Sequence, residues 1–222
     1  MYRTLELFDL EHTLARELLE GCEYPWLALP KIGETILALG PTLGAAYKEL
    51  LPQVWIHETA MVASTASITG PCIIGPGTEV RHCAFIRGNV LVGENCVVGN
   101  SVELKNVIIF DRVEVPHFNY AGDSILGYCS HMGAGSVTSN IKSDRTDVVM
   151  KDGEVQIPTG MLKIGAMLGD FVEVGCNSVL NPGAIVGRRT VIYPLSSVRG
   201  TVPADSILKT GGVTVPKEER TG

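Results

Sequence analysis

The sequence predicts a mainly β protein in which short strands coil into a solenoid. Aliphatic residues recur every six positions over most of the chain, and 25 glycines accompany an aromatic content of only 6%. A period of six fits neither a helix, with 3.6 residues per turn, nor a plain strand, with two. It fits a coil of short strands and turns, in which one aliphatic side chain of each six-residue unit points inward.

The first 52 residues are predicted to form a separate helical segment. Leucines between Asp9 and Leu19 have helical spacing, and Gly21 follows as a stop signal. Two further short helices are expected over residues 30–39 and 42–51. We expect this segment to cap the N-terminal end of the solenoid and to shield its open edge from further strand pairing.

The solenoid itself is predicted for residues 53–203. Ten apolar residues are spaced by six: Ile56, Val62, Ile68, Ile74, Val80, Ile86, Val92, Val98, Leu104 and Phe110. The phase is expected to slip near Pro116 and to resume at Leu126. Three units close a triangular coil, so the repeated region is expected to make roughly seven coils.

An insertion interrupts the repeat at residues 141–164. Within it, Lys151-Asp152-Gly153 separates two short apolar runs, which is a hairpin signal. We therefore expect a β-arm that projects from the solenoid, and residues 204–222 are expected to form a C-terminal tail.

Composition excludes several classes of function. The net charge of -6 and the lack of a basic stripe argue against a general nucleic-acid binder. The six cysteines form no CxxC motif and are interpreted as small buried side chains in a reducing compartment. The sequence has neither a secretory signal pattern nor an apolar run long enough to span a membrane, so a cytoplasmic chain without membrane contact is expected.

Polar residues concentrate where the repeat is expected to fail. Four polar residues lie close together outside the positions of the apolar repeat: His117, Asn119, Tyr120 and Asp123. Residues 132–140 follow, with small side chains that let a ligand approach the backbone. This stretch is the candidate active site.

Three fragments carry a resemblance to a known family: Val102-Glu-Leu-Lys-Asn106, Pro116-His-Phe-Asn-Tyr-Ala-Gly-Asp123 and Gly133-Ala-Gly-Ser-Val-Thr-Ser-Asn140. They resemble the acetyltransferase half of bifunctional sugar-1-phosphate nucleotidyltransferases, both the bacterial glucosamine-1-phosphate enzymes and the archaeal-type ones. The resemblance covers roughly residues 54–203. It implies a left-handed parallel β-helix of hexapeptide repeats and N-acetylation of an amino-sugar 1-phosphate. Acetyl-CoA is the implied co-substrate, no metal is expected, and the implied assembly is a homotrimer with active sites between subunits. Residues 1–50 lack a Gly-rich nucleotide loop, so nucleotidyl transfer is not expected.

The resemblance also assigns residues to roles. His117 matches the general base, a role that suits an imidazole near neutral pH. Arg87 and Lys105 match the phosphate-binding cations, and their spacing of 18 would stack them in adjacent coils. Further substrate contacts are implied at Glu103, Asn119, Tyr120, Asp123, His131 and Asn140. Acyl-CoA would lie along the edge of the solenoid, near Ala134, Cys176 and Tyr193.

Two other functions remain open on the sequence alone. One is a non-catalytic module that binds a sugar phosphate or promotes oligomerisation. The other is a zinc enzyme of the γ-carbonic anhydrase type, whose site needs two histidines five residues apart. Gly122 stands five residues after His117, which leaves only the loose trio His82, His117 and His131.

Overall fold

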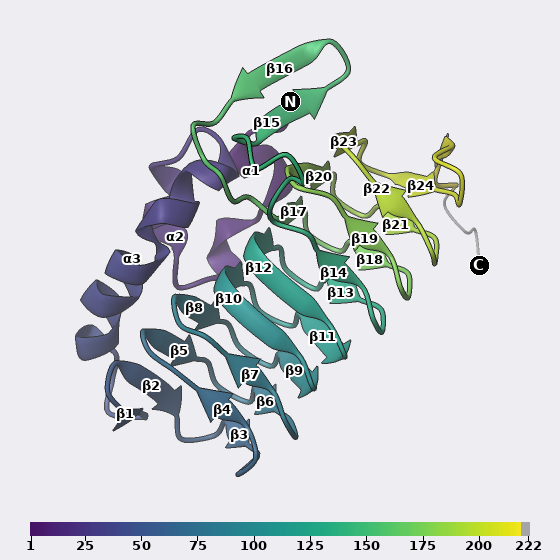
Figure 1. Ribbon diagram of the computed structural model, residues 1–222. Coiled ribbons are helices and arrows are strands. Elements are labelled where there is room, and N and C mark those ends of the chain that lie inside the picture. The colour runs from purple at the N-terminus through teal and green to yellow at the C-terminus, as the bar shows by residue number, and fades with distance from the viewer. Residues whose placement is uncertain (219–222) are drawn as a thin grey trace.

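The computed structural model describes residues 1–218 and confirms a parallel β-helix with three faces (Figure 1). The first face stacks β2 (Val54–His57), β5 (Cys72–Ile74), β8 (Val90–Val92), the C-terminal halves of β10 (Glu103–Ile109) and β12 (Tyr120–Leu126), β17 (Ala166–Leu168), β20 (Ala184–Val186) and β23 (Thr201–Val202). The second face stacks β3 (Met61–Val62), β6 (Glu79–Val80), β9 (Val97–Asn100), β11 (Glu114–His117), β13 (His131–Met132), β18 (Glu173–Val174), β21 (Val191–Ile192) and β24 (Ser206–Leu208). The third face stacks β4 (Ser67–Ile68), β7 (Phe85–Ile86), the N-terminal halves of β10 and β12, β14 (Val137–Thr138), β19 (Val179–Leu180) and β22 (Ser197–Val198).

The core is a stack of aliphatic side chains inside the coils. Ile56, Ile74 and Val92 pair in succession along the first face, 18 residues apart, as the period of six predicts. Ile74, Val92, Val98 and Leu104 are all fully buried. Each inner side chain therefore contacts its equivalents in the coils above and below, which is how a solenoid without a thick core removes apolar surface from water.

The phase slips earlier than the sequence indicated. Glu103 still pairs with Phe85, 18 residues away, but Val107 pairs with Val90, so one residue is missing at the corner formed by Lys105 and Asn106. β12 keeps this register against β10 along its whole length, so the next coil repeats the same tight corner. Phe110 consequently leaves the inner stack and packs against Phe8, with ring centroids 5.1 Å apart.

The N-terminal segment lies along the first face rather than over the end of the solenoid (Figure 1). It comprises α1 (Thr4–Leu7), α2 (Arg16–Glu20), α3 (Ile32–Leu39) and the 3-10 turns Leu10–His12, Pro25–Lys31 and Gly40–Thr42. The continuous helix expected from Asp9 to Leu19 is therefore wrong. Because this segment covers the first face, outward residues such as Ile73, Leu91 and Ile108 are at most 1% exposed.

Residues 42–51 do not form the expected helix, because Tyr47–Leu51 is a strand, β1, antiparallel to β2. The first coil leaves the outer edge of β2 with unpaired backbone groups, and these favour a strand over a short isolated helix. Gln53 takes a positive φ of 61° in the turn that reverses the chain. The open edge is thus shielded by a strand, not by a helical cap.

The insertion forms the predicted hairpin, with β15 (Val149–Asp152) antiparallel to β16 (Val155–Pro158). The solenoid resumes after it, since Leu126 pairs with Leu168. The predicted tail is wrong in part, because β24 continues the second face and β25 (Thr214–Pro216) pairs with it in antiparallel fashion. The last four residues of that tail lie outside the described range. Within residues 1–218, every helix is too short and polar to cross a membrane.

Candidate active site

His117 stands at the corner between the second and third faces. The chain turns there through Phe118, which has a φ of 52°, and Asn119, which is only 3% exposed. The Asn119 Oδ1 accepts the His117 N–H at 3.0 Å, and its Nδ2 donates to the carbonyl oxygen of Gly133 at 2.8 Å. This buried amide fixes the backbone that carries an exposed imidazole. Within residues 1–218, no side chain hydrogen-bonds that imidazole, so both ring nitrogens are available to a ligand.

A row of residues continues from His117 along the same edge. The Gly135 N–H donates to the His117 carbonyl at 3.0 Å, the Asn177 N–H to that of Ala134 at 2.8 Å, and the Leu195 N–H to that of Cys176 at 3.0 Å. His117, Ala134 and Cys176 therefore occupy equivalent corners of successive coils. Tyr193, 41% exposed, stands beside the next corner. The residues that the sequence assigned to acyl-CoA thus share one edge with His117.

A polar network fills the opposite corner, between the third and first faces. Asp123, 5% exposed, accepts from Lys105 Nζ at 3.3 Å and from Asn106 Nδ2 at 3.0 Å, and Asn140 Nδ2 also donates to it. The tight corner brings these residues together, because Asn106 and Asp123 both adopt a φ of 48° there. Asn106 is not among the site residues predicted from the sequence. Its signal was a spacing of 17 from Asn106 to Asp123 and from Asp123 to Asn140, one short coil each time.

Tyr120 lies on the third face between the two corners. A Cβ added at Gly122 would lie 2.2 Å from the Tyr120 Oη, so the phenol crosses over that glycine toward the polar network. Asn140 Nδ2 donates to the Tyr120 Oη at 3.0 Å. Burial raises the pKa of Tyr120, and the nearby Asp123 and Glu103 carboxylates raise it further. The phenol therefore stays neutral and can donate its proton in a hydrogen bond.

Arg87 and Glu103 form an ion pair on the same face, with Arg87 Nη1 2.6 Å from Glu103 Oε1. Both side chains are substantially exposed, at 45% and 35%. Such pairs contribute little to stability and exchange partners easily. The predicted cations thus lie in adjacent coils, each with a carboxylate partner that an incoming phosphate could replace or share.

The two corners are close enough for side chains from both to contact one ligand. Gly122 lies five positions after His117 and pairs with Lys105. The backbone distance from His117 to Gly122 across the face is therefore at most about 17 Å. Arginine, lysine and tyrosine side chains extend over much of that span. The third face can therefore present cations at one corner and a proton acceptor at the other.

His131 lies elsewhere, on the second face, where its Nδ1 is 3.1 Å from Glu173 Oε2. His82 occupies the corner of His117 two coils earlier, since the Ser101 N–H donates to the carbonyl of His82 and the Phe118 N–H to that of Asn100. In the described part of the chain, no three His, Cys, Asp or Glu residues gather as metal ligands. The loose histidine trio therefore forms no zinc site within one subunit.

Comparison with known proteins gives a match to the model of the GMPPB C-terminal domain family over residues 68–191. The chain is 31% identical over 180 residues to the bifunctional protein GlmU of Nostoc sp. PCC 7120, covering 79% of this chain and 34% of that protein. It is 33% identical over 142 residues to a bifunctional sugar-1-phosphate nucleotidylyltransferase/acetyltransferase of Sulfurisphaera tokodaii, covering 64% and 35%. The chain thus spans about a third of the length of these curated relatives. Among solved structures, the acetyltransferase domain of PglB from Neisseria gonorrhoeae matches with a TM-score of 0.33 and 16% identity over 84% of this chain and 65% of that one.

Proposed function

The chain belongs to the GMPPB C-terminal domain family, and from this premise we propose that it transfers an acetyl group from acetyl-CoA to the amine of an amino-sugar 1-phosphate. The observation that carries the proposal is the third face of the solenoid. It has an exposed imidazole, with its backbone fixed, at one corner and a cation-bearing polar network at the other. The relative named as a bifunctional sugar-1-phosphate nucleotidylyltransferase/acetyltransferase supports acetyl transfer as the type of reaction.

In this proposal His117 is the general base. The amine nitrogen attacks the thioester carbonyl, a C–N bond forms, and the C–S bond breaks to release CoA as a thiol. The amine must lose a proton to become an amide; the neutral imidazole accepts this proton and then donates it to the departing thiolate, which restores the neutral base. Base catalysis of this kind contributes about 10²–10⁴-fold to the rate. The buried Asn119 keeps the imidazole at the corner and takes no part in the proton transfer.

The phosphate of the substrate would bind at Arg87 and Lys105. Arginine offers a planar fork to phosphate oxygens and lysine a compact charge, and both donate charge-assisted hydrogen bonds. Tyr120, Asn140 and Glu103 would contact the sugar hydroxyls from the face between. His131 lies too far round the second face to join them within one subunit. Its predicted substrate contact would therefore be to a substrate held by residues of a second copy of the chain.

Acyl-CoA would lie along the edge that runs from His117 through Ala134 and Cys176 to Tyr193. Small side chains at Ala134 and Cys176 leave the backbone of that edge open. The pantetheine amides of CoA can then bond to backbone groups as a strand would. This arrangement delivers the thioester to the end of the row, where the imidazole lies.

We further propose a homotrimer in which the His117 edge faces a neighbouring subunit. Phe118 is 65% exposed and Leu195 is 71% exposed, both at this edge. Two such large exposed apolar side chains on the edge that carries His117 favour a surface that another protein covers. Light scattering of the purified chain should give three times the monomer mass, and a monomeric mass at working concentration would contradict the shared site.

The decisive experiment measures thiol release from acetyl-CoA with a panel of amino-sugar 1-phosphates. The native protein should release CoA with at least one of them, and His117→Ala should lower kcat by at least about 10²-fold. His82→Ala is the matched control, because His82 occupies the same corner two coils away and should retain activity. Saturable sugar-phosphate binding without turnover would favour the non-catalytic module instead.

A further inference from the structure

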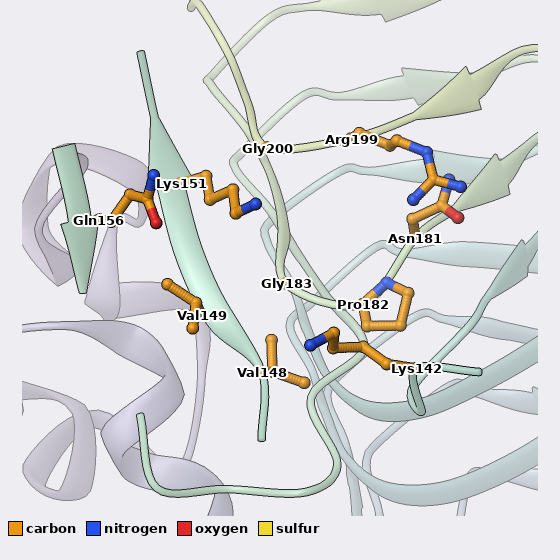
Figure 2. Close-up of a pocket in the computed structure, with 10 residues that line it drawn as sticks. All are labelled: Lys142, Val148, Val149, Lys151, Gln156, Asn181, Pro182, Gly183, Arg199 and Gly200. Carbon is orange, nitrogen blue, oxygen red and sulfur yellow. The ribbon is translucent and has the colours of Figure 1, made fainter. Parts of the chain in front are cut away.

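A second cleft lies on the other side of the polar network, between the hairpin and the C-terminal coils. Its volume is about 250 Å³. Its walls are the hairpin residues Val148, Val149, Lys151 and Gln156, and the coil residues Asn181, Pro182, Gly183, Arg199 and Gly200, with Lys142 at one end (Figure 2). We propose that this cleft binds a phosphate-bearing small molecule, at a site separate from the acetyl-transfer site.

The cleft is preformed because the hairpin is fixed to the coils on both sides of it. Thr201 Oγ1 donates to the Lys151 carbonyl oxygen at 2.8 Å. Val148 and Met150 are buried, and a Cβ added at Gly183 would lie 2.9 Å from Val148 Cγ1. Any larger residue at Gly183 would therefore push the hairpin away. A ligand entering the cleft meets walls that are already in place, which lowers the entropic cost of binding.

Three cations surround this cleft although the chain as a whole has a net charge of -6. Lys142 and Lys151 point toward the space between the hairpin and the coils, and the Arg199 guanidinium lies beside Asn181 at the rim (Figure 2). Lys142 has an acidic neighbour, Asp144, at 3.5 Å, in a hollow that adjoins the cleft. Across residues 1–218, no carboxylate lies within 4.0 Å of Lys151 or Arg199. The electrostatic preference of the cleft is therefore for an anion.

The remaining lining narrows the class of ligand. Val148, Val149 and Pro182 give apolar surface, while Gln156 and Asn181 supply one side-chain amide from each wall. A simple inorganic anion would leave the apolar walls unused. Phosphate groups held by lysine and arginine, joined to a sugar or ring that packs on the apolar walls, would use the whole lining.

The cleft is distinct from the candidate active site. Arg199 follows β22, and Lys105 belongs to β10. Three strands of the third face, β12, β14 and β19, lie between them. Four strand spacings of about 4.8 Å place the two levels about 19 Å apart along the solenoid. One phosphate cannot contact both Lys105 and Arg199, so variants at these two residues test the two sites separately.

Titration calorimetry of the full chain with pyrophosphate and with uridine diphosphate tests this proposal. Native protein should bind at least one of the two probes, more weakly as salt is raised. Lys151→Ala/Arg199→Ala should weaken binding about tenfold or more. Lys48→Ala/Lys209→Ala is the matched control, because it removes the same charge from exposed lysines elsewhere and should leave binding unchanged. Thermal melts of all variants should coincide, since the four side chains are exposed.

The second arm separates this cleft from the acetyl-transfer site. His117→Ala should bind the probes as the native protein does, and Lys105→Ala should keep the part of the binding that the Lys151/Arg199 double variant loses, whether or not either variant transfers acetyl groups. Loss of binding in Lys105→Ala, with retention in the Lys151/Arg199 double variant, would assign the probes to the active site and overturn the proposal. Failure of native protein to bind either probe at millimolar concentration, or binding of polyglutamate in their place, would overturn it too.

Discussion

At the scale of single residues, the positions of the candidate side chains depend on their neighbours. The Asn119 side-chain oxygen accepts the His117 N–H, and its amide group donates to the carbonyl oxygens of Gly133 and Ser136. Gly122 leaves room for the Tyr120 phenol to cross the face. Asn119 and Gly122 therefore help to set where the His117 imidazole and the Tyr120 phenol lie.

Asn119→Ala should lower both stability and activity. The change removes the Asn119 partner of the His117 N–H and of the Ser136 carbonyl oxygen, and an unsatisfied buried polar group costs about 1–3 kcal/mol. We expect urea unfolding to show a loss in that range, together with a lower kcat, since the corner that carries His117 loosens. Glu58→Ala, at an exposed polar side chain outside both proposed sites, is the control and should change neither. A kcat that falls with no loss of stability would instead make Asn119 a direct substrate contact.

At the scale of elements, the N-terminal segment packs on the solenoid through apolar side chains, and one buried carboxylate adds a polar anchor. Asp170, 1% exposed, accepts from the Asp9 N–H at 2.8 Å and from the Tyr128 N–H at 2.9 Å, and Arg188 Nη2 is 2.6 Å from it. Arg188 Nε also donates to the Leu7 carbonyl oxygen at 3.0 Å. One side chain thus ties residues far apart in the sequence to a single coil.

Asp170→Ala should loosen this part of the segment and destabilise the protein by about 3 kcal/mol or more, because it leaves a partly buried arginine and two amide hydrogens unpaired. The free energy of unfolding from urea titration measures the loss, and limited proteolysis should cut the first 45 residues sooner. Asp205→Ala is matched to it, since Asp205 pairs with Arg189 in an exposed bidentate contact and should cost less than about 1 kcal/mol. Equal losses in the two variants would contradict the anchoring role.

The elements that the sequence predicted well are those fixed by a local pattern. The period of six located the coils, and Lys151-Asp152-Gly153 located the hairpin. The pattern could not locate β1, because a strand of mostly exposed residues forms only when β2 offers it an edge. It also could not place the helical segment, although runs such as Cys72-Ile73-Ile74, apolar on both sides of the strand, are typical of a strand buried on both faces.

The residues of the candidate site also divide into those that a local motif predicts and those that depend on the register of the coils. His117, Tyr120, Lys105 and Asn140 could be proposed because each matches a motif at fixed spacing. Asn106 could not, because its role follows from a corner shortened by one residue, which shifts the register of two successive coils. The slip expected at Pro116 placed the irregularity beside His117, whereas the structure places it at the corner of Lys105 and Asn106. A one-residue deletion leaves only a weak trace in the apolar pattern when Ile109 and Phe110 can both serve as the inner residue.

At the scale of the whole molecule, the three faces of the solenoid and the edges between them differ in what covers them and in which polar residues they carry. The first face is covered by the N-terminal segment, and the third lies between the two corners of the candidate site. Beyond that site, the same edge that carries Lys105 continues to Asn181 and the second cleft. A fold in which equivalent positions recur every 4.8 Å or so can thus hold two anion sites in line without a second domain.

The narrow core also predicts how the molecule responds to alkaline pH. Cys72 and Cys96 lie inside the coils, 0% and 1% exposed, and burial raises the pKa of both thiols, that of Cys96 to about 12 from an ordinary value of 9.0. Above pH 9 the unfolded chain releases these protons while the folded chain keeps them. The contribution of these protonated thiols to the free energy of unfolding is therefore complete below pH 9. It is lost as the pH rises toward 12, by about 1.4 kcal/mol per pH unit for each thiol.

Urea unfolding at pH 7, 9 and 10.5 measures the slope of the free energy of unfolding against pH. Cys72→Ala/Cys96→Ala should flatten it even though the variant is less stable at pH 7, and Cys176→Ala, at an exposed thiol, should leave it unchanged. A double variant with the native slope would show that other groups control the alkaline limit.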